Sequence, residues 1–265
     1  MKLGRITLIV LATVVLTTLG VGAADTWRGA SGSLLAQLMG VQPATGCPVG
    51  MTTFTTAQTF SCIDTYEVSP GETCTVRDIT SADGTAQDIT DPDCKPVSLS
   101  GMMPWRFVTR AQAMTVCAKA GKRLPTAREW YEAGLGTETA NCNVHGGGVV
   151  STGKYQTCVA ASGIHDVVGN LWEWVSDDVI NGQYQGRTLP PSGYIVQTDN
   201  GGVATVTSQT SASSTGGYLW SDVGGSFGFL RGGFYGSESD AGLVTLQAAT
   251  SPNFSGVAVG FRCVQ

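Results

Sequence analysis

Eight cysteines are the residues of this chain best suited to redox or metal chemistry. They are Cys47, Cys62, Cys74, Cys94, Cys117, Cys142, Cys158 and Cys263. An even number of cysteines in an exported chain predicts disulfides, although the sequence alone does not choose the pairing. No two cysteines have Cys-x-x-Cys spacing, and His145 and His165 are the only histidines. A transition-metal site is therefore not indicated.

Other catalytic groups are equally sparse. No Gly-x-Ser-x-Gly motif indicates a serine hydrolase, and the adjacent acids Asp177 and Asp178 are typical of a solvated turn. Residues 234–259 contain no Lys, Arg, His or Cys, and their only acids are Glu238 and Asp240. Acid–base and nucleophilic catalysis both need such groups. We therefore expect that the protein is not an enzyme.

The N-terminal segment has the pattern of an export signal. Lys2 and Arg5 precede an apolar run over residues 6–21, which small residues follow. This pattern predicts a signal peptide over residues 1–24, and an uncleaved N-terminal anchor that tethers the chain to a membrane is the alternative. Residues 25–46 are interpreted as a leader or spacer, and residues 47–265 as one domain. We expect an exported protein in an extracellular, periplasmic or cell-surface location.

The composition and net charge of the chain limit the classes of partner that it can bind. The 265 residues are 42% hydrophobic, 13% charged and include 36 glycines, which suits one loop-rich domain with a sizeable core. The formal net charge is −5, and two of the basic residues fall in the signal segment. An acidic exported chain is a poor ligand for nucleic acid or anionic lipid. We therefore expect no nucleic-acid partner.

Two helices have clear start and stop signals. Thr109 precedes a helix that Gly121 ends, and Thr126 with Glu129 forms a capping box for a second helix that ends at Gly134. These two helices must carry most of the regular α structure.

The remaining chain is strand or loop. Residues 60–69 alternate between apolar and polar types, which predicts a strand. Residues 70–94 and 178–229 are rich in Gly, Ser, Thr and Asp, so we expect loops there. Strand-like composition returns after residue 229. These elements predict an α+β fold.

Several segments together carry a family resemblance. They are CIDTYEVS, AGKRLPTAREWYEAG, GIHDVVGNLWEWVSD, LRGGFYG and GFRCV. In this order and spacing, between Cys62 and Val264, they resemble the formylglycine-generating-enzyme-like (sulfatase-modifying factor) branch of the C-type lectin fold. The resemblance implies little regular secondary structure and a first strand that pairs with the last.

The resemblance also implies one disulfide. In the family, the cysteine before AGKRLPT bonds the cysteine of GFRC, and those positions here are Cys117 and Cys263. For the other cysteines, proximity along the chain suggests three pairs, which are Cys47–Cys62, Cys74–Cys94 and Cys142–Cys158.

A structural Ca²⁺ site is a further implication. Matching positions would be the side chains of Asp166 and Glu173 with the carbonyls of Gly169 and Leu171, a set of oxygen ligands that suits Ca²⁺. Asp166 departs from the amide that the family has there. In the same motif we expect Trp172 and Trp174 to be packed aromatics and Asn170 to satisfy buried backbone groups.

The enzymes of this family use groups that are missing here. The oxidase uses a redox-active cysteine pair shortly after its Arg-Gly-Gly motif, and residues 234–242 contain no cysteine. A related branch binds iron through three histidines, and this chain has two. An exported formylglycine-generating-type oxidase is the alternative function, and these absences argue against it.

The C-terminal segment carries a second resemblance. Residues 231–263 resemble the variable region of proteins that are diversified by diversity-generating retroelements. The fixed frame of such regions corresponds here to Arg231-Gly232-Gly233, Ala241-Gly242, Thr245-Leu246, Pro252 and Gly260-Phe261-Arg262-Cys263.

Between the frame residues lie the candidate ligand-binding positions, which we call the variable positions. They are Phe234, Tyr235, Gly236, Ser237, Ser239, Asp240, Gln247, Ala249, Thr250, Asn253, Phe254, Ser255, Gly256, Val257 and Ala258. Many are reachable from an asparagine codon by changing only its adenines, as such elements mutate; Gln247 is not. Aromatic residues give large contact area, and Ser, Gly, Asp and Thr give adaptable hydrogen bonds.

These observations predict a ligand-binding protein with a variable face. We expect Phe234 and Phe254 to be exposed and Leu243, Val244 and Leu246 to lie in the core, whereas Tyr235 is assigned equally to either. The expected partner is a protein or surface structure of another cell or a virus, and it would differ between copies.

Overall fold

The computed structural model describes residues 46–54, 60–211 and 216–265, and Cys47–Gln265 form one compact unit. The predicted signal segment and nearly all of the predicted spacer lie outside the described residues. Within these described residues, no helix has both the length and the apolar character needed to cross a membrane.

Short strands dominate the described part of the domain, which also contains three α-helices. In chain order the helices and strands are β1 (Met51–Thr53), β2 (Cys62–Asp64), β3 (Ser69–Pro70), α3 (Ala82–Thr90), β4 (Pro96–Val97), α4 (Arg110–Lys119), α5 (Ala127–Gly134), η1 (Thr139–Asn141), β5 (Trp172–Ile180), β6 (Gln183–Tyr184), β7 (Arg187–Thr188), β8 (Gly193–Thr198), β9 (Ala204–Ser208), β10 (Tyr218–Ser221), β11 (Ser226–Gly232), η3 (Glu238–Asp240), β12 (Gly242–Thr250) and β13 (Val259–Phe261). The expected α+β class is confirmed.

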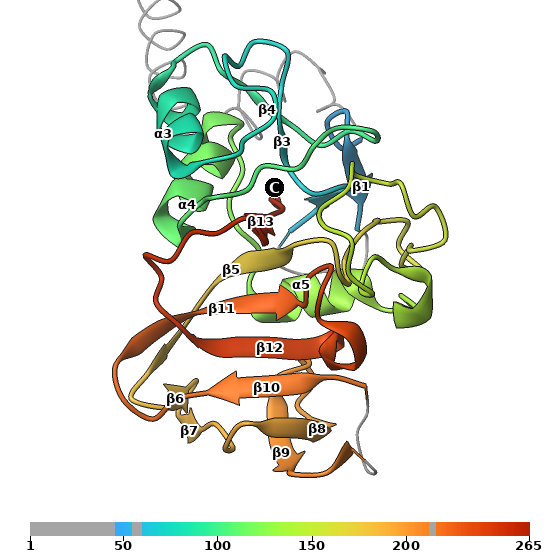
Figure 1. The fold of residues 1–265 in the computed structure, drawn as a ribbon, viewed down its shortest axis with the longest axis vertical. Coiled ribbons are helices and arrows are strands. Elements are labelled where there is room, and N and C mark those ends of the chain that lie inside the picture. The colour runs from blue at the N-terminus through green and yellow to red at the C-terminus, as the bar shows by residue number, and fades with distance from the viewer. Residues whose placement is uncertain (1–45, 55–59, 212–215) are drawn as a thin grey trace, which may run out of the picture. The chain divides into compact units, whose positions relative to one another are not determined.

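One nine-stranded sheet forms the centre of the domain (Figure 1). Its strands run in the order β7-β6-β5-β11-β12-β10-β8-β9, and β13 pairs with β5 off this path. Most pairs are antiparallel, but β10 pairs with β12 in parallel and β13 pairs with β5 in parallel. The C-terminal segment thus supplies β12 to the middle of the sheet and β13 beside β5.

Side chains alternate between the two faces of this sheet. On one face, Val175 and Phe229 join the core cluster that contains Trp130 of α5. On the other face, Trp174 and Leu230 join the cluster that contains residues of α4. Each face of the central strands is therefore anchored by one helix.

Both predicted helices are confirmed with their caps. Thr126 accepts a hydrogen bond from the Glu129 N–H, and the Glu129 side chain accepts one from the Thr126 N–H. Gly121 follows α4 with φ +68° and donates to the Ala118 carbonyl, which is the expected left-handed helix stop.

Helix α3 was missed, because residues 70–94 were expected to be a loop. Ser81 caps the helix by accepting a hydrogen bond from the Gly84 N–H. A capping box needs Glu or Gln at the position of Gly84, so the sequence carries no such mark of the helix start. Lys119 of α4 then donates to the carbonyls of Asp88 and Asp91 at the end of α3.

Residues 178–229 were also wrongly expected to be loops. They contain strands β6 to β10 and part of β11. Two of these strands have partners far away in the chain, since β10 pairs with β12 and β11 pairs with β5, whereas β6 with β7 and β8 with β9 pair locally. Tertiary pairing therefore outweighs the Gly/Ser/Thr-rich composition.

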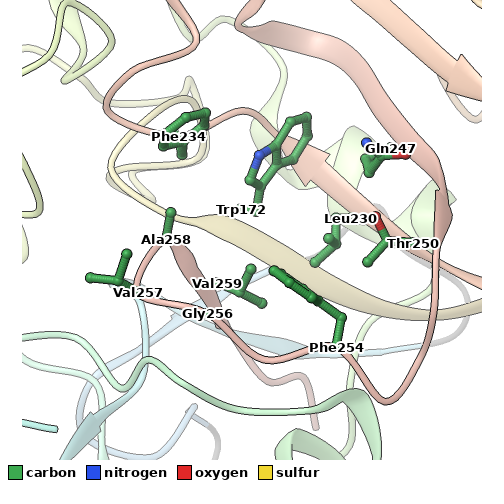
Figure 2. Close-up of a pocket in the computed structure, with 10 residues that line it drawn as sticks. All are labelled: Trp172, Leu230, Phe234, Gln247, Thr250, Phe254, Gly256, Val257, Ala258 and Val259. Atoms are coloured by element: carbon green, nitrogen blue, oxygen red, sulfur yellow. The ribbon is translucent and has the colours of Figure 1, made fainter. Parts of the chain in front are cut away.

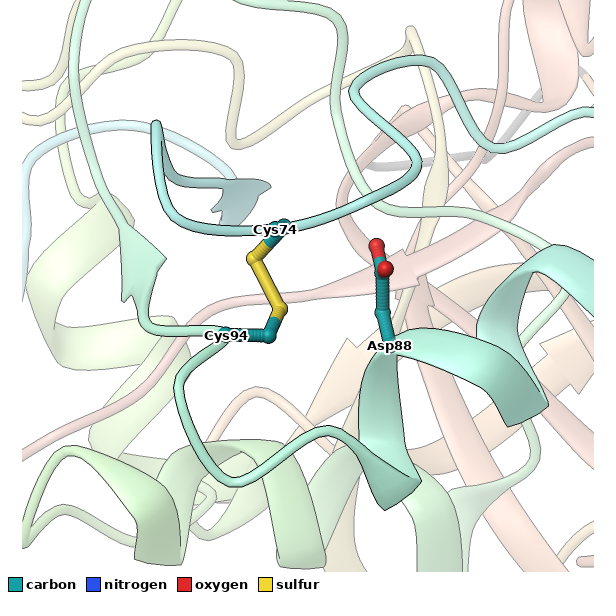
Figure 3. Close-up of side chains that lie close together, drawn as sticks. All are labelled: Cys74, Asp88 and Cys94. Atoms are coloured by element: carbon teal, nitrogen blue, oxygen red, sulfur yellow. A yellow bond between two sulfur atoms is a disulfide. The ribbon is translucent and has the colours of Figure 1, made fainter.

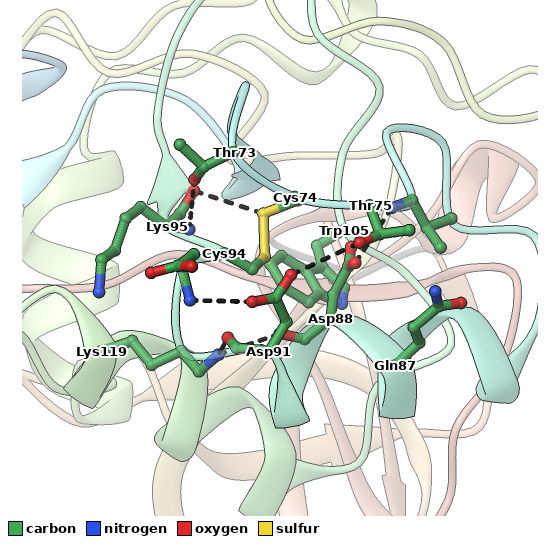
Figure 4. Close-up of a disulfide and its surroundings, with 12 residues drawn as sticks. Thr73, Cys74, Thr75, Gln87, Asp88, Asp91, Cys94, Lys95, Trp105 and Lys119 are labelled. Carbon is green, nitrogen blue, oxygen red and sulfur yellow. Dashed lines mark hydrogen bonds between the residues drawn. A yellow bond between two sulfur atoms is a disulfide. The ribbon is translucent and has the colours of Figure 1, made fainter.

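All four predicted disulfides are present. They are Cys47–Cys62, Cys74–Cys94, Cys117–Cys263 and Cys142–Cys158. Figure 4 shows the Cys74–Cys94 bond beside the C-terminal end of α3, with Lys119 on the neighbouring helix. Every cysteine is paired.

The two ends of the domain meet, as the resemblance implied. Ile63 and Val264 form an antiparallel bridge, and the Asp64 N–H donates to the Cys263 carbonyl. The predicted strand over residues 60–69 is shorter than expected, because β2 ends at Asp64 and β3 begins at Ser69.

Candidate ligand-binding face

The C-terminal segment separates into buried frame and accessible variable positions. None of the variable positions is buried. Phe254 is 49% exposed and Phe234 is half-buried, whereas Leu246 is fully buried and the partly buried Leu243 and Val244 pack against the core. Nearly every frame residue is buried, Pro252 being half-buried.

Two neighbouring pockets lie on this accessible surface, and both include Trp172, Phe234 and Gln247. The first has a volume of about 360 Å³ and is lined by Trp172, Leu230, Phe234, Gln247, Thr250, Phe254, Gly256, Val257, Ala258 and Val259. Figure 2 shows Trp172 between Phe234 and Gln247, with Phe254 on the opposite wall. The second has a volume of about 300 Å³ and is lined by Trp172, Trp220, Phe234, Gly236, Ser237, Asp240 and Gln247. Together they define what we call the binding face.

Most variable positions contribute to these pockets, and five do not. These five residues lie outside both pocket linings. Three are half-buried, namely Tyr235, Ala249 and Ser255, and two are exposed, namely Ser239 and Asn253. They lie on the accessible surface without shaping either pocket.

Strand register explains how distant residues reach the same face. Leu230 of β11 and Trp220 of β10 are both partners of Gln247 on β12. Trp172 begins β5 and lies two residues before Trp174, so both indoles point to the same side of the strand. The binding face is therefore built on the central strands rather than on a loose loop.

Two tryptophans of this face were not predicted. Trp172 packs against the same core cluster as Trp174, as expected, but Trp174 is fully buried whereas Trp172 is half-buried and also lines both pockets. Trp220 lies in the segment that was expected to be loop. The Tyr-Leu-Trp sequence of β10, with only Leu219 fully buried, is the alternating signal that could have found it.

Main-chain hydrogen bonds hold the segment that connects β12 to β13. Three bonds join it to other elements, from the Phe107 N–H to Gly256 O (2.9 Å), from the Arg110 N–H to Pro252 O (3.1 Å) and from the Trp172 N–H to Ala258 O (2.8 Å). Since these bonds use only backbone atoms, side chains at the variable positions do not determine the path of this segment.

Glycines of the frame and of the variable positions differ in the space around them. A Cβ at Gly260 would lie 2.6 Å from Leu171 Cδ1 and 2.9 Å from the Trp105 carbonyl oxygen. At Gly256, a Cβ would meet only the end of the Phe254 ring, at 3.1 Å. A movable aromatic ring can give way, whereas a packed backbone cannot. Gly256 can therefore accept side chains that Gly260 excludes.

The electrostatics of the face are acidic. Burial, followed by repulsion from Glu238, raises the pKa of Asp240. No basic side chain lines either pocket. The surface therefore suits neutral or cationic groups and disfavours anions.

The residues expected to bind Ca²⁺ do not fit such an ion. Both Glu173 carboxylate oxygens accept hydrogen bonds from Arg262, at 2.6 and 2.7 Å, and one also accepts from Trp130 Nε1 at 2.7 Å. A guanidinium already neutralises Glu173, so a cation there would face a like charge. Asp166 Oδ2 accepts from the Gly153 N–H at 2.6 Å, and burial is the main cause that raises the Asp166 pKa to about 6.

Asn170 has the expected structural role. Its side-chain amide donates to Glu67 and to the Val150 carbonyl, and its oxygen accepts from the Val150 N–H. Burial, reinforced by Asp166 and Glu173, raises the pKa of Glu67 well above its usual value. This buried polar network supports the strand that carries Trp172.

One further cluster brings potential metal ligands together, Cys74, Asp88 and Cys94 (Figure 3). The two sulfurs form a disulfide and are not thiolates, so they do not offer metal ligands. Asp88 Oδ1 accepts from the Val76 N–H at 3.0 Å. The cluster is a structural feature of the α3 region.

Sequence and structure comparisons place the chain among known proteins. Residues 50–265 match the model of the sulfatase-modifying factor enzyme 1-like domain. A search of curated proteins finds no match.

Several solved structures resemble the domain at low identity. The Major Tropism Determinant U1 variant has 21% identity and a TM-score of 0.48, with 84% of this chain and 54% of that one covered. Treponema denticola variable protein 1 has 15% identity and a TM-score of 0.42 (82% and 91% covered), and PvdO from Pseudomonas aeruginosa has 17% and 0.42 (81% and 89%). This chain thus spans about half the length of the first of these structures.

The family match covers the whole compact unit except its first three residues. It agrees with three features of the structure, which are the strand-rich α+β architecture, the meeting of the domain ends and the Cys117–Cys263 bond. The chain belongs to the family of sulfatase-modifying factor enzyme 1-like domains, with the formylglycine-generating-enzyme-like form of the C-type lectin fold.

Proposed function

We propose that this chain is an exported ligand-binding protein whose variable positions, between Phe234 and Ala258, are diversified by a retroelement. The partner is a protein or surface structure of another cell or a virus, and it differs between copies of the gene. Recognition rests on shape and polar complementarity, without a chemical step. Four disulfides support an oxidising compartment for the protein.

The observation that carries this proposal is the separation between frame and variable positions. The variable positions are all accessible, and most of them line two adjoining pockets, whereas the frame residues between them are almost all buried. A surface that must change its sequence needs this separation, because substitutions at buried positions would destabilise the fold.

The composition of the face also supports binding. Phe234 and Phe254 offer large apolar surfaces, and the small residues Gly236, Ser237 and Gly256 leave space for a partner between them. Aromatic anchors surrounded by small, adaptable residues are typical of paratopes.

Formylglycine-generating-type oxidation, the alternative, lacks support among the described groups. All eight cysteines are in disulfides, so no thiolate is available to react with a substrate thiol. His165 stacks on Tyr66 and its pKa is lowered by burial and by Arg262, while His145 is exposed. Purified protein supplied with copper should leave a cysteine-containing peptide unoxidised, and turnover of that peptide would contradict the proposal.

A pair of libraries tests the proposal directly. In one, twelve of the variable positions are replaced by residues reachable through adenine changes in asparagine codons; in the matched one, the twelve frame positions are replaced. We expect most variants of the first library to remain folded, as measured by protease resistance on the cell surface, and to yield binders against unrelated proteins. Frame variants should mostly unfold.

Equal loss of folding in both libraries would contradict the proposal. A second check uses sibling genes, which should differ at adenine-template positions within 231–263 and almost nowhere else. Differences spread evenly over residues 47–265 would exclude diversification by a retroelement.

A further inference from the structure

We infer that the smaller pocket of the binding face is an aromatic cage for an alkylammonium or guanidinium group of the partner. This inference rests on the proposed ligand-binding function and names the chemical class that this copy of the protein recognises. Three aromatic side chains and one carboxylate line the pocket, namely Trp172, Trp220, Phe234 and Asp240.

The aromatic walls have the geometry that such a cage needs. The ring centroids of Trp172 and Trp220 are 5.7 Å apart, and the two indole planes meet at 84°. Perpendicular indoles form two adjoining walls instead of one flat platform, and Phe234 adds a third aromatic contact. A compact cation can contact several π faces at once in such a corner, whereas a flat sugar or base ring needs a coplanar platform.

Asp240 supplies the negative charge. It is half-buried in the pocket lining, and no described residue donates a hydrogen bond to its carboxylate. Its raised pKa shows that burial and the neighbouring Glu238 disfavour the charged form. A cation in the pocket would relieve both effects, since it would neutralise the carboxylate in a partly desolvated place.

Size and surroundings agree with one cationic group. The volume of about 300 Å³ lies at the lower limit of small-molecule sites, so the pocket holds a head group or one side chain. No basic side chain lines the pocket, so nothing in its lining repels a positive charge.

The cage combines fixed and variable parts. Trp172 and Trp220 lie outside residues 231–263, whereas Phe234 and Asp240 are variable positions. The two indoles therefore remain in every copy, and residues 234 and 240 decide whether the pocket prefers a cation. Another copy with a neutral residue at position 240 would keep the aromatic corner and lose the preference for positive charge.

The experiment compares choline with its neutral isostere 3,3-dimethylbutanol on the intact protein. Binding is followed through the indole N–H signals of the six tryptophans in ¹⁵N-labelled protein. Substitution of Trp172→Phe and Trp220→Phe, each checked by thermal melting, assigns their signals. We expect choline to shift these two signals saturably, and the neutral isostere to bind roughly tenfold more weakly.

Asp240→Asn should weaken choline binding by roughly tenfold and leave the neutral isostere unchanged. Glu238→Gln is the matched control. It removes the same negative charge only two residues from Asp240, but the Glu238 side chain does not line the pocket. Equal affinity for the two probes, no shift at Trp172 and Trp220 with choline, or equal effects of both substitutions would each overturn the cage. Partners selected on the variable face would then still support the proposed function.

Discussion

At the scale of single residues, the C-terminal segment mixes positions that tolerate change with positions that do not. The difference follows from what an added side chain would meet, and the sequence does not show it, because Gly256 and Gly260 are identical residues four positions apart. The resemblance to retroelement-diversified proteins assigns Gly260 to the frame and Gly256 to the variable positions, and the space around the two glycines agrees with this assignment. Physical chemistry of the sequence alone could not, since contacts with Leu171 and Trp105 come from distant parts of the chain.

The two glycines give the first prediction. Gly260→Ala should lower the free energy of unfolding by about 2 kcal/mol or more, because the new methyl group meets a packed side chain and a backbone carbonyl. Gly256→Ala should change it by less than about 0.5 kcal/mol. Urea unfolding of both variants measures the difference, and similar losses in the two would contradict the assignment of frame and face.

A buried ion pair gives the second prediction. Lys122 Nζ lies 2.6 Å from Asp64 Oδ1, and the Asp64 carboxylate also accepts from the Cys263 N–H. Burial is the main cause that raises the Asp64 pKa, while Lys122 opposes it. Lys122→Met removes that opposition, so at neutral pH it should lower the free energy of unfolding by about 3 kcal/mol.

The loss of unfolding free energy in Lys122→Met should grow as the pH rises. A carboxyl whose folded pKa is raised contributes stability that is complete at low pH and is lost as the pH rises through that pKa. Without Lys122 the Asp64 pKa rises further, so the deficit should be small near about pH 4 and should grow toward pH 7. Urea unfolding of both proteins across this range measures it. The double variant with Asp64→Asn should recover most of the neutral-pH loss, and a pH-independent deficit would contradict this account.

At the scale of elements, local signals predicted what local interactions decide. The caps at Thr109 and Thr126 involve residues three positions apart, so both helices could be found from the sequence. Helix α3 lacks a capping box, and β10 and β11 depend on partners distant in sequence, β12 and β5. Trp220 was not assigned to the binding face, because the alternating pattern of β10 does not show that this strand pairs with β12.

The capping box of α5 gives the third prediction. Thr126→Ala removes the acceptor of the Glu129 N–H and should lower the free energy of unfolding by about 1 kcal/mol. Thr115→Ala is the matched control, because Thr115 is exposed within α4 and its substitution should be nearly neutral. Thermal unfolding monitored by circular dichroism separates the two. A larger loss for Thr115 would show that the cap is not what stabilises this part of the domain.

At the scale of the whole molecule, one disulfide ties the C-terminal segment to the rest of the domain. Cys117 lies in α4 and Cys263 follows β13, at a sequence separation of 146. The bond therefore closes a loop that includes the entire central sheet. The other three disulfides each close a short loop of 15 to 20 residues.

Loop size gives the fourth prediction. Replacing Cys117 and Cys263 together by alanine should lower the free energy of unfolding by about 5 kcal/mol, and replacing Cys47 and Cys62 should lower it by about 3 kcal/mol in the chain-entropy model. Guanidinium unfolding of the two double variants measures the order. The reverse order would show that local packing around Cys62 outweighs the entropy of the unfolded chain.

The connection from β12 to β13 has a consequence for evolution. Its path is fixed by the carbonyls of Pro252, Gly256 and Ala258, and every amino acid carries a carbonyl. Rewriting the side chains there therefore leaves the same hydrogen bonds available to each descendant. Under the proposed diversification, the number of possible surfaces therefore multiplies with every position that changes, while the backbone of the segment stays the same.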